Sequence, residues 1–184
     1  MEIGYPRCDH FFWSQENLIC FIKEKEPETL DILNQIKKYK KIIIYLPTFR
    51  EKADNDLRRI IDFDLLEKKL REKNYLLIVK QHPNIRLSKE NNYKNIILLK
   101  STMDVYLIIP FTDVLITDYS SVLFDYILLK KPIILFPYDK ENYLYEEKGF
   151  YFDYMKLNII GDIVDNFEDL IKKIFCESYI CRDM

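Results

Sequence analysis

The sequence contains little glycine and little histidine. Only three glycines occur in 184 residues, and none forms the G-x-G-x-x-G or P-loop pattern, which excludes the glycine-rich phosphate cradles. The two histidines, His10 and His82, have no second cluster of metal-ligating residues around them, so we expect no metal site. The four cysteines form no C-x-x-C pair and lack the dense spacing of a secreted disulfide scaffold, which favours reduced thiols in a cytosolic setting.

Long apolar runs and a strong net charge are also missing. No apolar run approaches the roughly 20 residues that a membrane-spanning helix needs, so we expect a protein that is not integral to a membrane. The formal net charge is only -2, which gives no indication of a nucleic-acid-binding surface.

Apolar runs alternate with amphipathic segments along the whole chain. Continuously apolar strands are buried on both faces, which requires helices above and below a parallel sheet. We therefore predict an α/β fold: a single Rossmann-like, doubly wound parallel-sheet domain over residues 1–184, with about five strands. The predicted strands are 41–46, 75–80, 95–99, 113–117 and 132–136, and the predicted helices are 14–25, 27–40, 63–74, 102–111, 120–130 and 167–177.

A short polar segment, Thr117-Asp118-Tyr119-Ser120-Ser121, follows one buried strand. Ligands of such sheets gather at the carboxyl ends of the strands. The next helix is predicted to start near Ser120 or Ser121, where backbone N–H groups and serine hydroxyls would bind an anion, with a diphosphate as the natural choice. The alternative is that Asp118 or Ser120 only caps the helix.

Other strand exits carry groups suited to phosphate chemistry. His82 follows the strand 75–80 and could accept a proton near neutral pH, although a lone loop histidine is more often a surface residue. Arg50, Lys80 and Lys100 place positive charge on the same rim. Gly149 permits a tight turn in an aromatic-rich segment that either receives a nucleotide or lies on the core.

Asp125 stands seven residues after Asp118. Since no D-x-D element accompanies it, we assign it to no metal site. We expect it to be a helix-surface or packing residue.

Five motifs in order carry a resemblance to one family. They are "GYPRCD" at 4–9, "YLPTFR" at 45–50, "KQHP" at 80–83, "DVLITDYSSVLFDYILLKKPIILFPYD" at 113–139 and "KGFYFDY" at 148–154. This set resembles the CDP-glycerol glycerophosphotransferases, which prime or polymerise wall teichoic acid and related polyol-phosphate polymers.

The resemblance implies the C-terminal, nucleotide-binding half of a GT-B transferase, whose N-terminal acceptor half is absent from this chain. By resemblance, His82 is the catalytic residue. The donor-binding residues implied are Arg50, Thr117, Asp118, Ser120, Ser121, Lys148 and Gly149. The implied reaction is in-line attack of an acceptor hydroxyl on the β-phosphorus of CDP-glycerol, which releases CMP and needs no cofactor. Lys148 stands where the family typically has arginine, and "NIIGD" replaces the usual Pro-Gly-Pro.

The resemblance also implies partners and a location. The acceptor would be a polyol phosphate or a lipid-linked molecule, and the protein would work in the cytoplasm at the inner face of the plasma membrane. A separate N-terminal half, or self-association, would complete the enzyme. Two alternatives stay open: a non-catalytic nucleotide-binding module, and a nucleotide-sugar-dependent GT-B transferase of capsule synthesis.

Overall fold

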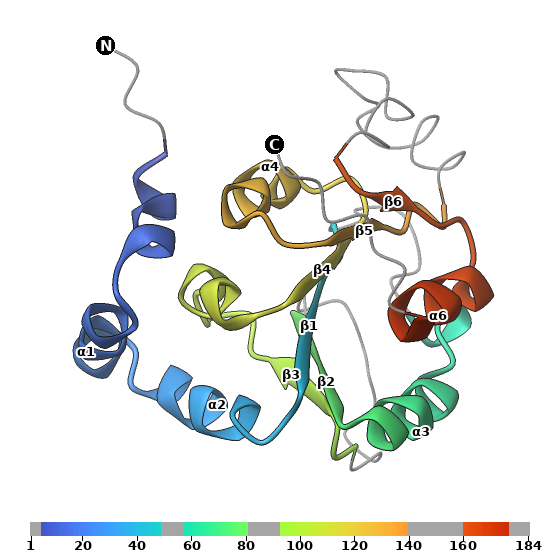
Figure 1. The fold of residues 1–184 in the computed structure, drawn as a ribbon, viewed down its shortest axis with the longest axis horizontal. Helices are drawn as coiled ribbons and strands as arrows, with labels where there is room; N and C mark the ends of the chain where they lie inside the picture. Colours follow the sequence, from blue (N-terminus) through green and yellow to red (C-terminus); the bar gives the residue numbers. More distant parts are fainter. Residues whose placement is uncertain (1–4, 49–56, 81–92, 140–159, 177–184) are drawn as a thin grey trace.

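The computed structural model describes residues 5–48, 57–80, 93–139 and 160–176, which contain one six-stranded sheet (Figure 1). The strand order is β3-β2-β1-β4-β5-β6 and every neighbouring pair is parallel. The strands are β1 (Lys41–Leu46), β2 (Tyr75–Lys80), β3 (Ile96–Leu99), β4 (Val114–Thr117), β5 (Ile133–Leu135) and β6 (Asp162–Ile163). The predicted doubly wound α/β fold is confirmed. The sixth strand was missed because it has two residues, too few to form an apolar run.

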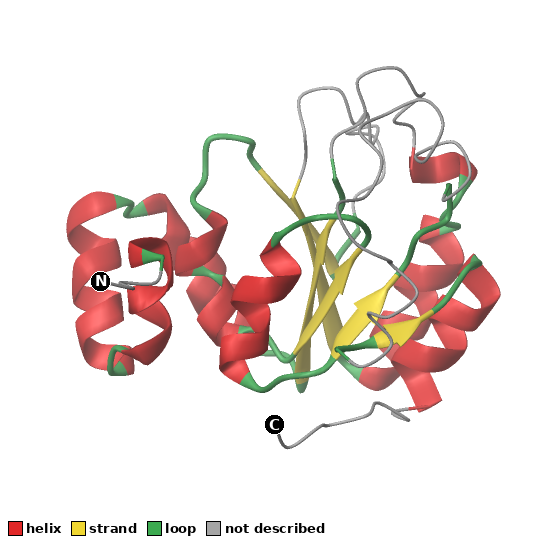
Figure 2. Ribbon diagram, turned by 90° about the horizontal axis from the view of Figure 1, so that it is seen from above, coloured by secondary structure: helices red, strands yellow, loops and turns green. Residues whose placement is uncertain are grey.

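Helices cover both faces of the sheet (Figure 2). The α-helices are α1 (Gln15–Lys25), α2 (Glu28–Ile36), α3 (Phe63–Lys73), α4 (Val122–Tyr126) and α6 (Phe167–Cys176), and the 3₁₀ segments are η1 (Pro6–Phe12), η2 (Leu57–Arg59), η3 (Val105–Leu107), η4 (Ile109–Phe111) and η5 (Ile127–Leu129). One core lies under α1, α2, η3, η4 and α4, and the other lies under η2, α3 and α6. The assignment of residues 1–184 to a single domain stays a prediction.

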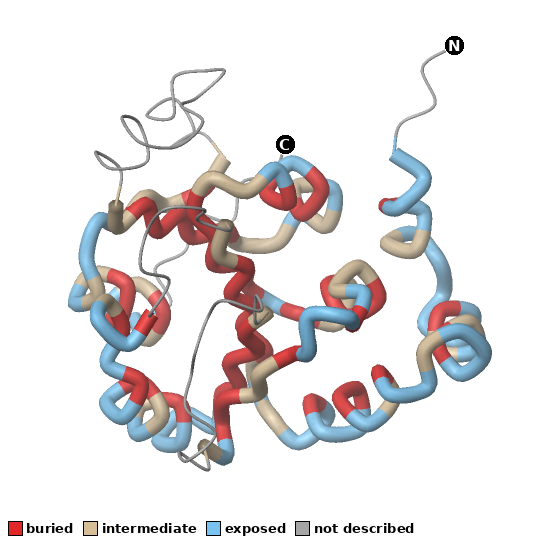
Figure 3. Tube along the Cα trace, turned by 180° about the vertical axis from the view of Figure 1, so that it is seen from behind, coloured by how far each residue is buried: buried red, intermediate tan, exposed pale blue. Residues whose placement is uncertain are grey.

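Strand residues alternate between these two cores. In β1, Ile42 and Ile44 belong to the core under α1 and α2, whereas Ile43 and Tyr45 belong to the core under α3 and α6. This alternation follows from the two-residue period of a strand. Both faces of the sheet are therefore buried in the middle of the molecule (Figure 3), which explains why the strands are continuously apolar.

Helix boundaries follow local capping chemistry. The Ser14 hydroxyl accepts from the backbone N–H of Asn17 at 3.2 Å at the start of α1. Asp62 caps α3 in the same way, and Asn74, with a left-handed φ of 58°, ends it. The predicted helix 27–40 ends earlier, at Ile36.

One helix prediction was wrong in kind and one in extent. Residues 102–111 form the two short 3₁₀ segments η3 and η4 instead of one helix, and Pro110, which has no N–H to donate, lies in the second. Residues 120–130 contain the five-residue α4 followed by η5, after which Lys130 adopts a left-handed φ of 54°. The helix expected to present a strong dipole to a ligand is therefore short.

Gly161 packs against β5 just before β6. A Cβ at this position would lie 2.6 Å from the backbone oxygen of Ile133. Because a backbone atom cannot move aside cheaply, Gly161→Ala is expected to lower the free energy of unfolding by about 1–3 kcal/mol, measured by urea denaturation. The exposed Asp165→Ala serves as the nearby control. Equal unfolding midpoints for the two variants would contradict this packing argument.

Candidate functional site

The carboxyl ends of five strands meet at one edge of the sheet, and hydrogen bonds join the loops that follow them. Thr48 after β1 donates to Asp118 after β4, from its backbone N–H at 2.8 Å and its hydroxyl at 2.5 Å. Lys80 at the end of β2 donates from Nζ to the backbone oxygens of Lys100, at 3.2 Å, and Met103. The Tyr119 hydroxyl donates to Asp139 after β5 at 3.0 Å. The described polar residues at this edge thus form a layer that is joined in two groups, one after β1, β4 and β5 and the other after β2 and β3.

Thr117 and Asp118 lie inside this layer. Both are 0% exposed. The Thr117 hydroxyl donates to the backbone oxygen of Leu46 at 2.8 Å, and one Asp118 oxygen accepts from Thr48 and from the backbone N–H of Tyr119 at 2.6 Å. Buried side chains engaged in this way support the turn instead of presenting themselves to a phosphate, and a carboxylate would in addition repel one.

Ser120 and Ser121 lie on the surface side of the same turn. Ser120 is half-buried and its Oγ accepts from the backbone N–H of Val122 at 3.4 Å, while Ser121 is exposed and its side chain makes no capping bond to α4. The predicted start of the helix near these two serines is confirmed. Of the four residues predicted in this turn, these two hold hydroxyls that a ligand can reach.

A hollow of about 230 Å³ opens beside the two serines. It is lined by Leu46, Pro47, Lys80, Val105, Tyr106, Ser120, Ser121 and Val122. Burial lowers the pKa of the Lys80 ammonium, an effect that Asp104 and Glu26 oppose. A larger hollow, of about 450 Å³, lies beside the start of α3 and contains Arg58 and Arg59, but no part of the serine turn.

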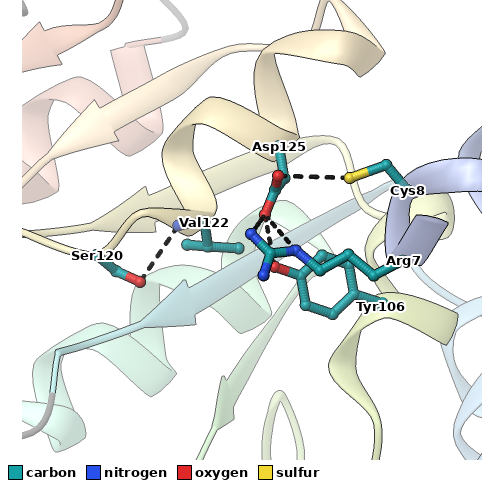
Figure 4. Close-up of polar contacts among 6 residues, drawn as sticks. All are labelled: Arg7, Cys8, Tyr106, Ser120, Val122 and Asp125. Atoms are coloured by element: carbon teal, nitrogen blue, oxygen red, sulfur yellow. Dashed lines mark hydrogen bonds and ion pairs between the residues drawn. The ribbon is translucent and has the colours of Figure 1, made fainter. Parts of the chain in front are cut away.

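Asp125 on α4 was expected to be a helix-surface or packing residue, and the structure places it inside the protein, not on the helix surface. It is 3% exposed, and its carboxylate accepts from Arg7, Cys8 and Tyr106 (Figure 4). The sequence does carry a sign of this burial, because Asp125 is an acidic residue within the apolar run "VLFDYILL". A buried carboxylate at such a position needs partners from elsewhere in the chain.

Four predicted residues, Arg50, His82, Lys148 and Gly149, lie outside the described residues, and their roles stay predictions. Within the described ranges, no three His, Cys, Asp or Glu side chains are grouped so that they could hold a metal ion. None of the helices described is long and apolar enough to span a bilayer.

Comparison with known proteins gives consistent matches over the whole chain. The family model for CDP-glycerol:poly(glycerophosphate) glycerophosphotransferase matches residues 1–178. A teichoic acid poly(ribitol-phosphate) polymerase of Bacillus spizizenii is 35% identical over 96% of this chain and 28% of its own length. A teichoic acid glycerol-phosphate transferase of Staphylococcus aureus is 33% identical over 93% of this chain and 43% of its own length.

Solved structures agree with these matches. The wall teichoic acid polymerase TagF superposes with a TM-score of 0.68 at 31% identity, over 95% of this chain and 42% of that chain. A TagF variant soaked with CDPG superposes with a TM-score of 0.70 at 33% identity, over the same shares of the two chains. The chain therefore spans less than half the length of each of these relatives.

Proposed function

The chain belongs to the CDP-glycerol:poly(glycerophosphate) glycerophosphotransferase family, and on that premise we propose that it forms the donor-binding part of an enzyme of polyol-phosphate transfer. The reaction transfers glycerol phosphate from CDP-glycerol to a hydroxyl of a teichoic-acid-like acceptor and releases CMP. The observation that carries this proposal is the hollow at the carboxyl edge, where the Ser120 and Ser121 hydroxyls lie beside the Lys80 side chain.

The donor diphosphate is proposed to rest against the first turn of α4. Ser120 and Ser121 would donate hydrogen bonds to phosphoryl oxygens, and hydrogen bonds to charged acceptors are stronger than neutral ones. Because α4 has only five residues, few peptide dipoles are aligned, and we assign most of the charge neutralisation to side chains. Arg50 and Lys148 are the proposed cations, from the family resemblance.

The transfer step is proposed to be an in-line displacement at the β-phosphorus. An acceptor hydroxyl attacks, a new P–O bond forms, and the bond to CMP breaks as CMP leaves. His82 is proposed to accept the proton of the attacking hydroxyl. Neither a metal ion nor a cofactor is part of this proposal.

The acceptor and the cellular location are proposals as well. A polyol phosphate or lipid-linked acceptor would meet the nucleotide donor in the cytoplasm, at the inner face of the plasma membrane. Because the chain spans less than half of its relatives, further sequence, from the same or another chain, would supply the acceptor side.

Calorimetric titration with CDP-glycerol, CDP-ribitol, CDP and UDP tests the donor site. We expect binding of the CDP compounds, and the double variant Ser120→Ala/Ser121→Ala should bind at least about tenfold more weakly because two bonds to charged oxygens are lost. The control is Ser14→Ala, which removes a hydroxyl at the start of α1, away from the hollow. Undiminished affinity in the double variant would exclude this turn as the diphosphate site.

The same titration, extended to a nucleotide sugar and combined with an assay of CMP release, separates the alternatives. Preference for UDP or a nucleotide sugar would favour a capsule transferase. Tight CDP-glycerol binding without transfer, even when the missing part of a relative is added, would favour a binding module.

A further inference from the structure

Asp125 holds a charge network that the proposed chemistry does not use. Its Oδ2 accepts from Arg7 Nε at 3.1 Å, from Arg7 Nη2 at 2.8 Å and from the Tyr106 hydroxyl at 2.6 Å, and its Oδ1 accepts from Cys8 Sγ at 3.4 Å (Figure 4). The Asp125 side chain is 4% exposed. A carboxylate removed from water in this way is tolerated because both of its oxygens are bonded.

The protonation states of the partners suit donation to Asp125. Burial raises the pKa of the Tyr106 phenol, and the bond to Asp125 raises it further. Burial and the same carboxylate also raise the pKa of the Cys8 thiol. For Arg7, partial burial alone would lower the pKa, but Tyr106 and Asp125 outweigh it and the pKa is raised. All three groups therefore stay protonated near neutral pH.

Tyr106 connects this network to the hollow. Its ring is one wall of the hollow. Phe11 stacks on it with ring centroids 5.9 Å apart and planes 13° apart, and the Arg7 guanidinium lies 5.4 Å from its centroid. The phenol ring is thus held by residues of η1 on one side and by Asp125 at its hydroxyl.

The same carboxylate belongs to α4. Asp125 is a residue of this helix, and Ser121 is its N-cap, four positions earlier. The hollow is lined by Ser121 and Val122 at the start of this helix. The Asp125 side chain therefore joins Tyr106 and Arg7 to the helix whose start lines the hollow.

We propose that the Arg7–Asp125 pair is a positioning element of the nucleoside diphosphate site, which fixes the Tyr106 ring and the serine turn at the separation that the ligand requires. Arg7, Tyr106 and Asp125 act through the walls and are not catalytic residues. The proposal rests on the proposed donor function. It adds a requirement for Arg7 of η1, although no residue of η1 lines the hollow.

Four variants test this role in the 184-residue chain. Arg7→Met and Asp125→Asn remove one charge each, Tyr106→Phe removes only the hydroxyl, and Arg7→Lys keeps the charge without the bidentate geometry. The control is Lys172→Met, which breaks an ion pair of 2.9 Å with Asp169 on the exposed surface of α6.

Hydrogen exchange without ligand provides the first measurement. Amides of α4 should exchange at least about tenfold faster in Arg7→Met and Tyr106→Phe, because local opening is easier when an anchor is lost. The exchange rates of the β2 amides should be unchanged. In Arg7→Lys, the exchange rates of the α4 amides should lie between those of the unmodified chain and those of Arg7→Met. Unchanged exchange in α4 overturns the proposal whether or not the chain binds a nucleotide.

Titration with CDP-glycerol provides the second measurement. Arg7→Met and Asp125→Asn should weaken binding at least about tenfold at a temperature where both are folded, with partial recovery in Arg7→Lys. A lower melting temperature with undiminished affinity would show a purely structural role and overturn the proposal. If the unmodified chain does not bind CDP-glycerol, the proposed function fails, and hydrogen exchange alone then decides for or against the positioning role. Tyr106→Phe and Arg7→Lys nearly preserve side-chain volume, so they remain usable if Arg7→Met does not fold.

Discussion

The Asp118→Ala protein is expected to lose about 3 kcal/mol of unfolding free energy and to lose CDP-glycerol binding. The carboxylate is 0% exposed, and one of its oxygens accepts from the backbone and hydroxyl of Thr48 and from the backbone N–H of Tyr119. Alanine would leave those partly buried donors without this acceptor, and a donor that loses its partner away from water costs free energy. The loop after β1 and the serine turn after β4 would then lose their common anchor. Urea denaturation measures the first effect and calorimetric titration the second.

Asp113 provides a matched control at the other end of the same strand. Its carboxylate accepts from the backbone N–H of Ile42 at 2.7 Å, at the amino ends of β1 and β4. Asp113→Ala should also destabilise the protein, but it should leave the affinity for CDP-glycerol unchanged when the protein is folded. Asp118→Asn keeps an oxygen acceptor, so it should lose less unfolding free energy and less affinity for CDP-glycerol than Asp118→Ala. If Asp118→Ala bound the donor as tightly as Asp113→Ala, the turn would not depend on this anchor.

The second large effect is expected at His82. Loss of a general base typically slows a reaction by about 10²–10⁴-fold, so His82→Ala should reduce transfer by at least about 100-fold while the affinity for CDP stays the same. Transfer is measured as CMP release from CDP-glycerol with a polyol-phosphate acceptor. The assay uses the chain alone, and the chain with the part of the staphylococcal glycerol-phosphate transferase that it does not match.

The second histidine of the chain is the control for this experiment. His10 lies in η1, with its ring 4.5 Å from that of Trp13 and 5.0 Å from that of Phe21. His10→Asn should leave the rate of transfer unchanged. Turnover by His82→Ala at the rate of the unmodified protein would remove His82 from the mechanism.

Elements defined by local chemistry were predictable from the sequence. The strand β1 was found because an apolar run ends at Pro47, α1 was found from Ser14 as its cap, and α3 was found from its periodic apolar residues. The parallel arrangement followed from strands that are apolar on both faces. In a parallel sheet the loops that follow the strands lie at one edge, and the structure confirms this position for the described polar loops.

Elements defined by distant contacts were not predictable in the same way. Whether Asp118 contacts a ligand or a loop depends on Thr48, which lies 70 positions earlier in the chain. Residues 102–111 have an apolar pattern compatible with a helix, but the structure gives two 3₁₀ turns. Periodicity does not distinguish these outcomes over such a short segment.

The sequence by itself determined the parallel sheet and the edge at which the polar loops and the two serines lie, because apolar periodicity, proline and capping residues act within a few positions. Only the tertiary structure decided that Thr117 and Asp118 are buried supports and that Asp125 is held by Arg7, 118 positions away. A carboxylate has the same covalent structure on a surface and in a core. Its role is set by the donors that folding brings within about 3 Å.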